Sequence, residues 1–96
     1  MEKLIIPEQD IINAVCVLMS RKEFMEPEDI EVELLYDDVN GYYAEAFANG
    51  VKHNLQTYHL IEALRSWLKD FLNIDPFAAG IQLQIDEEQG MIAVIH

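Results

Sequence analysis

The chain has 96 residues, of which 51% are apolar, enough for one folded domain over residues 1–96 with its own core. Its 18 acidic and 6 basic residues give a formal charge of −12, which disfavours nucleic acid and anionic membranes and favours a basic partner. One cysteine excludes an intramolecular disulfide, and no apolar run approaches the ~20 residues of a membrane span, so we expect a soluble, cytoplasmic protein.

The first third of the chain is predicted to contain a short strand and one helix. The strand runs from Lys3 to Ile6. Pro7 suits the first position of a helix, and Arg21 and Lys22 suit the negative end of its dipole. Only a thin polar stripe interrupts the apolar residues, so most of this helix should be buried, with Cys16 as a packed core thiol. The apolar residues at helical spacing are Ile11, Ile12, Val15, Leu18 and Met19.

Three strands are predicted to follow this helix. Ile30 to Asp37 alternates between apolar and polar residues, which is the pattern of a half-buried strand. Asn40-Gly41 and Asn49-Gly50 signal tight turns. These turns delimit a second strand from Tyr42 to Ala48 and a third from Val51 to about Gln56.

A second helix is predicted after the third strand. Thr57 is a suitable N-cap, Asn73 suits the left-handed position after the last turn, and Pro76 prevents continuation. Its wide apolar face comprises Leu60, Ile61, Leu64, Trp67, Leu68 and Phe71.

A short helical turn ending at Gly80 and a final hairpin complete the predicted chain. The hairpin pairs Ile81–Asp86 with Met91–Ile95 around Gly90. The element order is α-β-β-β-α-β-β with one strand in front. This order predicts an α+β fold, in which an antiparallel β-sheet has two helices packed on one face.

The lengths of the turns determine which side chains share a face of the sheet. A two-residue turn at Asn49-Gly50 pairs Ala46 with His53. A three-residue loop ending at a left-handed Gly41 pairs Leu34 with Ala46. Together the two registers predict a core face of Ile30, Val32, Leu34, Tyr36, Ala44, Ala46, Ala48, Val51 and Leu55.

Other apolar side chains are directed to the face that carries no helix. The final hairpin, with an analogous loop, adds two residues to this set and directs Ile81, Leu83, Ile85, Ala93 and Ile95 to the core side. If the set is contiguous, an apolar patch rimmed by carboxylates suggests an interface, and a two-fold homodimer is the commonest use of one. The alternative is that the residues are scattered, as on any protein surface. The predicted interface comprises Leu35, Tyr43, Phe47, Ile92 and Val94.

Acidic residues are concentrated between Glu23 and Asp38, a stretch without a basic residue. Such charges can simply protect an edge strand from aggregation. Alternatively, they bind a basic partner or imitate nucleic acid, because side chains on one strand face repeat every ~7 Å. The predicted acidic patch comprises Glu28, Asp29, Glu31, Glu33, Asp37 and Asp38.

No group of residues predicts catalysis, a metal site or a cofactor. His59 and Glu62 are neighbours on the second helix, but the predicted register points His53, the nearest third ligand, to the core instead. The Asn40-Gly41 turn lacks the ligands of a calcium loop, because Tyr36 and Phe47 stand at positions that need carboxylates.

Three stretches spread over nearly the whole chain carry a resemblance to a known family. They are Ile5–Ile12, Glu31–Leu34 with Tyr36–Asp38, and Asp75–Phe77 with Gly80-Ile81. On these stretches the sequence resembles the YxcD-like proteins, small proteins of Bacillus-type bacteria with no assigned function. The resemblance implies a bacterial cytosolic protein and supplies no catalytic residue.

Three functions remain open on the sequence alone. The leading hypothesis is a non-enzymatic protein-interaction module, homodimeric through the open sheet face. The second is an acidic inhibitor or nucleic-acid mimic that occupies a basic groove on a partner protein. The third is a small ligand-binding protein or enzyme with a pocket between the second helix and the sheet, lined by Trp67, Tyr58 and His53.

Overall fold

The computed structural model describes residues 4–96 and contains two helices, six strands and a short 3-10 helix. The α+β class and the predicted order of elements are confirmed. The predicted first strand begins at Lys3, which lies outside the described residues. In chain order the elements are β1 (Leu4–Ile6), α1 (Glu8–Glu23), η1 (Pro27–Asp29), β2 (Glu31–Asp37), β3 (Gly41–Ala48), β4 (Val51–Leu55), α2 (Thr57–Phe71), β5 (Ile81–Asp86) and β6 (Gly90–Ile95).

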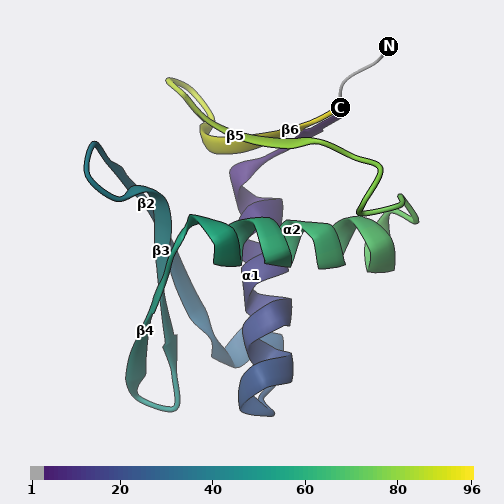
Figure 1. Ribbon diagram of the computed structural model, residues 1–96. Helices are drawn as coiled ribbons and strands as arrows, with labels where there is room; N and C mark the ends of the chain where they lie inside the picture. The colour runs from purple at the N-terminus through teal and green to yellow at the C-terminus, as the bar shows by residue number, and fades with distance from the viewer. Residues whose placement is uncertain (1–3) are drawn as a thin grey trace.

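The strands form two three-stranded antiparallel sheets, where the sequence had suggested one. One sheet has the order β1-β6-β5 and the other the order β2-β3-β4. The run Met91–Ile95 is apolar throughout, and its side chains on both faces of the sheet are buried, as suits the central strand of the three. Because β1 and β5 occupy both edges of β6, no edge of that strand remains for β2. Figure 1 shows α1 and α2 crossing, with β2–β4 on one side and β5 and β6 above them.

One hydrophobic core joins both helices to both sheets. Ala44, Ala46 and Ala48 of β3 are almost fully buried, and their small side chains let the helices approach this sheet closely. The largest fully buried side chains come from the helices and are Ile11, Val15, Leu60, Leu64 and Leu68.

The predicted N-cap of α2 is wrong by one residue. Gln56 occupies the N-cap position: its backbone N–H donates to Nδ1 of His59 at 2.9 Å, and its backbone carbonyl accepts the N–H of His59. The Thr57 hydroxyl instead donates to the carbonyl of Tyr42, which ties the start of α2 to β3. Asn73 follows the last turn with a φ of 54°, as predicted.

The β3–β4 register is confirmed, whereas the β2–β3 register is shifted by two residues. Leu34 pairs with Ala44, not with Ala46. The carboxylate of Asp37 accepts the N–H groups of Val39 and Asn40 at 2.8 and 2.6 Å, and this closes the turn earlier than predicted. A shift of two residues leaves every side chain on its predicted face.

Three residues predicted in the core are largely exposed instead. Tyr36 is 50% exposed, Val51 54% and Ile85 51%. Each lies beside a hairpin turn at the end of its strand. The alternation of the sequence predicts the face of such a residue but not how far the helices extend over it.

Candidate functional site

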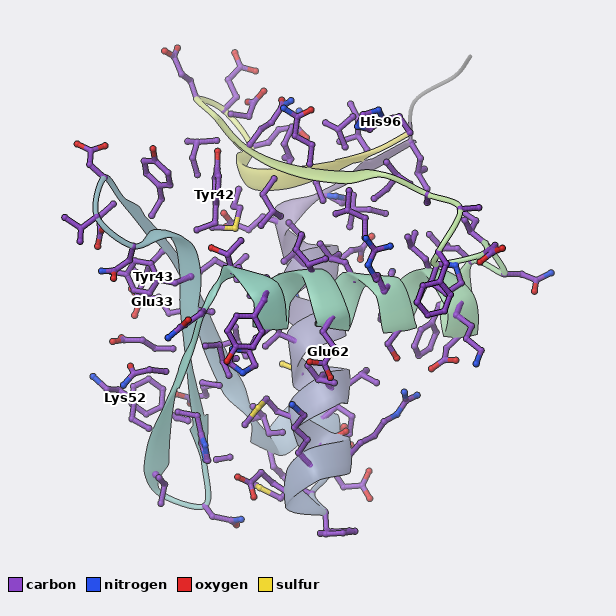
Figure 2. The ribbon with its side chains drawn as sticks, viewed as in Figure 1. Glu33, Tyr42, Tyr43, Lys52, Glu62 and His96 are labelled. Carbon is purple, nitrogen blue, oxygen red and sulfur yellow. The ribbon has the colours of Figure 1, made fainter. Side chains whose placement is uncertain are left out.

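The sheet β2-β3-β4 has one face that points away from both helices, which we call the outer face. Figure 2 shows Glu33, Tyr43 and Lys52 projecting from this side of the sheet. Three cross-strand rows build the face: Glu31, Phe47 and Lys52 in the first, Glu33, Glu45 and Asn54 in the second, and Leu35 with Tyr43 in the third.

The outer face has an apolar part made of three of the five predicted interface residues. Phe47 is 41% exposed, whereas Leu35 and Tyr43 are half-buried. Leu35 and Tyr43 are direct cross-strand partners, and Phe47 lies four residues from Tyr43 on the same strand face. The sheet therefore presents two aromatic rings and one aliphatic side chain without a helix over them.

Ile92 and Val94 do not belong to this surface, which corrects the sequence-based set. They lie in the other sheet and are only 5% and 7% exposed. Their cross-strand neighbours on the same face are Ile5, Gln82 and Gln84, and these flank the central strand β6 on both sides. The unbroken apolar run of β6 was the signal for this burial, since a strand with one open face alternates.

Carboxylates surround the apolar part of the outer face. Its strands carry four of them, on Glu31, Glu33, Asp37 and Glu45, and one ammonium group, on Lys52. Lys52 lies 3.2 Å from Glu45 and offsets part of this charge. Glu33 and Glu45 are paired directly across the strands, an arrangement of like charges that destabilises a sheet.

The predicted acidic patch extends beyond the outer face. Glu31, Glu33 and Asp37 lie along β2, Glu28 and Asp29 are exposed on η1, and Asp38 is exposed in the β2–β3 turn. The Asn40 backbone N–H and then its side-chain amide hold the pKa of Asp37 below its usual value. Partial burial raises the pKa of Tyr43, and the charge of Asp37 raises it further.

An open cavity of about 790 Å³ lies between the β2–β3 turn and the start of α2. Of the three residues proposed for a pocket beside the second helix, only Tyr58 lines it. Trp67 lines a separate hollow between α1 and α2 with Cys16, and its ring stacks 4.3 Å from that of Phe71. The cavity is lined by Val39, Asn40, Tyr43, Leu55, Gln56, Thr57, Tyr58 and Ile61.

The side chains of His53, His59 and Glu62 have separate partners. Nε2 of His53 lies 3.0 Å from the carboxylate of Glu23, His59 caps α2, and Glu62 lies 3.9 Å from Lys22. They do not converge on one point. Within residues 4–96 no cluster of side chains has the composition of a metal site.

The thiol of Cys16 is half-buried, where the sequence suggested full burial. Its Sγ lies 3.5 Å from the carbonyl oxygen of Ile30, to which it donates. Burial raises the pKa of this thiol, so the thiolate that a nucleophile requires is disfavoured.

Comparison with known proteins places the chain in a family. The sequence profile of the family described as "Protein of unknown function (DUF2653)" matches residues 1–88. The chain is 35% identical to the uncharacterised protein YxcD of Bacillus subtilis (strain 168) over 95 residues, which cover 97% of this chain and 92% of that protein. No solved structure matches the chain. The chain therefore belongs to the DUF2653 family and resembles a bacterial protein, as the sequence motifs had suggested. Neither helix in the described part of the chain is long and apolar enough to cross a membrane.

Proposed function

We propose that this chain is a non-enzymatic interaction module whose outer face binds a basic segment of a partner protein. The observation that carries the proposal is the pairing of Glu33 with Glu45 beside the exposed ring of Phe47. Like charges placed directly opposite one another weaken the sheet. A row of positive charge on a partner would turn this internal repulsion into attraction between the two proteins.

The apolar part of the face gives such a partner something to bury. Interfaces are organised around buried aromatic anchors with a polar rim, and charge complementarity at the rim mainly raises specificity and association rate. Phe47 and Tyr43 supply the rings, and the carboxylates of Glu31 and Glu33 supply the rim. A cytoplasmic location is part of the proposal, because the unpaired Cys16 suits a reducing compartment.

The same charges argue against the homodimer. A two-fold axis brings the same patch of both subunits together, so Glu31, Glu33 and Glu45 would face a second set of identical carboxylates. A basic partner meets no such repulsion. The proposal therefore keeps the interaction module of the first sequence-based hypothesis but takes the basic partner of the second in place of the homodimer.

Capture of partners from a bacterial lysate tests the proposal when two charge-reversed variants are compared. The test variant is Glu31→Lys with Glu33→Lys on the outer face. The control is Glu87→Lys with Glu88→Lys, at two exposed positions of the β5–β6 turn. Both variants have the same net charge, so a difference between them reports the location of binding and not the overall charge.

We expect wild type and the turn variant to retain the same basic protein, and the outer-face variant to lose it. Retention by all three proteins would contradict the proposal. Sedimentation of the isolated wild type tests the homodimer. If the wild type forms a dimer and the outer-face variant does not, the outer face binds a second copy of the chain and not a basic partner.

A further inference from the structure

The cavity between the β2–β3 turn and α2, here called the hairpin cavity, adjoins the outer face. Tyr43 belongs to both, since it is the cross-strand partner of Leu35 on the outer face and also lines the cavity. The cavity measures about 790 Å³, within the range of ~300–1,000 Å³ that is usual for ligand pockets. A partner seated on the outer face would therefore meet its opening.

The walls of the hairpin cavity combine aliphatic surface with aromatic rings. Val39, Leu55 and Ile61 are aliphatic, and Tyr43 and Tyr58 contribute the rings. Tyr58 is 62% exposed, so its ring is accessible. A long side chain with an apolar stem and a charged planar head matches such walls, because the stem packs on aliphatic groups and the head stacks on a ring.

The charge around the cavity selects a cation. Asp37 holds a carboxylate close enough to Tyr43 to raise the pKa of that hydroxyl, and Asp38 is exposed in the adjoining turn. The first turn of α2 opposes this with a partial positive charge equivalent to about half an elementary charge. Two full negative charges in the turn outweigh it, and the charge of −12 on the whole chain acts in the same direction.

We propose that the hairpin cavity receives an arginine side chain of the basic partner. The proposal rests on the proposed function, because the same partner would occupy the outer face. Arginine fits better than lysine, since its planar guanidinium stacks on aromatic rings and carries several donors for amide oxygens such as that of Asn40. Asn40 donates its amide N–H to Asp37 at 3.0 Å, an arrangement that fixes the orientation of its side chain.

Two peptides of equal charge distinguish binding in the cavity from binding on the outer face. Acetyl-pentaarginine amide and acetyl-pentalysine amide are titrated into the full chain, and their dissociation constants are measured by calorimetry. Electrostatic attraction alone treats the two peptides alike, whereas stacking in the cavity favours arginine by about two- to fivefold. The test variant is Tyr58→Ala, Tyr58→Phe retains the ring, and Phe77→Ala removes an 89% exposed ring outside the cavity.

We expect wild type, Tyr58→Phe and Phe77→Ala to prefer the arginine peptide, and Tyr58→Ala to bind both peptides equally. Equal binding by the wild type would overturn the cavity proposal and leave the proposed function intact. A preference that survives in Tyr58→Ala would also overturn it, because the arginine would then bind elsewhere. If the wild type binds neither peptide at millimolar concentration and low salt, the proposed function fails together with the cavity.

Discussion

Replacing Gly90 with alanine is expected to destabilise the protein more than the same change at Gly50. Both glycines have a left-handed backbone, with φ of 77° and 74°, which disfavours a residue with a Cβ by roughly 1–2 kcal/mol. At Gly50 the new methyl group would meet no atom within 4 Å, but at Gly90 it would overlap the carboxylate of Glu8. That carboxylate accepts the backbone N–H of Met91 at 2.8 Å and ties α1 to the last hairpin.

Displacing Glu8 from Gly90 removes a hydrogen bond to a charged group, which contributes about 1.5 kcal/mol at the low end suited to a half-exposed side chain. The free energy of unfolding should therefore fall by about 1–2 kcal/mol in Gly50→Ala and by about 2.5–3.5 kcal/mol in Gly90→Ala.

Urea denaturation followed by circular dichroism measures both values, and Glu8→Ala supplies the control. In the Glu8→Ala background, Gly90→Ala should be no more destabilising than Gly50→Ala, because the contact that distinguishes the two glycines is gone. Equal losses at Gly90 and Gly50 in the wild-type background would refute the reasoning.

Three further predictions concern the core, the pH dependence and the cysteine. Leu64 is fully buried, so Leu64→Ala should lower the free energy of unfolding by about 2–5 kcal/mol, whereas Glu62→Ala at an exposed site should change it by under about 0.5 kcal/mol in the same urea denaturation experiment. The backbone N–H groups of Gln89 and Glu88 hold the pKa of Asp86 below its usual value. This stabilisation is present above about pH 4 and is lost as the pH falls through the folded-state pKa. The urea midpoints at about pH 6 and about pH 3 should therefore differ less in Asp86→Ala than in the wild type. An unchanged difference would contradict this. Cys16 should react with a thiol reagent more slowly in the folded protein than in urea, because burial raises its pKa, and equal rates would show an open thiol.

The sequence was sufficient for the local elements and the strand faces. Alternation from Ile30 to Asp37 predicted β2, and Asn49-Gly50 predicted both the β3–β4 turn and its register. The assignment of the β2 side chains to the two faces was correct even though the register was shifted, because a shift of two residues preserves the alternation. The shift itself came from one side chain: Asp37 accepts two backbone N–H groups and starts the turn earlier than the glycine alone suggests.

The division into two sheets was not accessible to the same reasoning. Turn residues determine pairing within a hairpin, but the pairing of β1 with β6 joins strands from opposite ends of the chain. No local pattern encodes such a contact. The apolar run Met91–Ile95 does not alternate, which nevertheless indicates that its side chains on both faces are buried, and this would have removed Ile92 and Val94 from the predicted interface.

The hairpin cavity likewise depends on contacts between segments that are far apart in the sequence. Val39 and Asn40 are turn residues, and Tyr58 lies on a helix eighteen or more positions later. The bond from the Thr57 hydroxyl to the carbonyl of Tyr42 brings these segments together. The sequence predicted a pocket between the second helix and the sheet, lined by Trp67, Tyr58 and His53. Of these only Tyr58 lines the cavity, and Trp67 faces the groove between the helices instead.

The most direct test of the outer face compares two glutamate substitutions on one hairpin. Phe47 and Val51 are 41% and 54% exposed and belong to neighbouring strands, but they lie on opposite faces of the sheet. Phe47→Glu and Val51→Glu add the same negative charge, which by itself favours a basic partner. If the outer face binds the partner captured from lysate through Phe47, calorimetry should show an affinity at least about tenfold weaker for Phe47→Glu and an unweakened affinity for Val51→Glu. Equal affinities for the two variants would contradict the assignment of the binding surface.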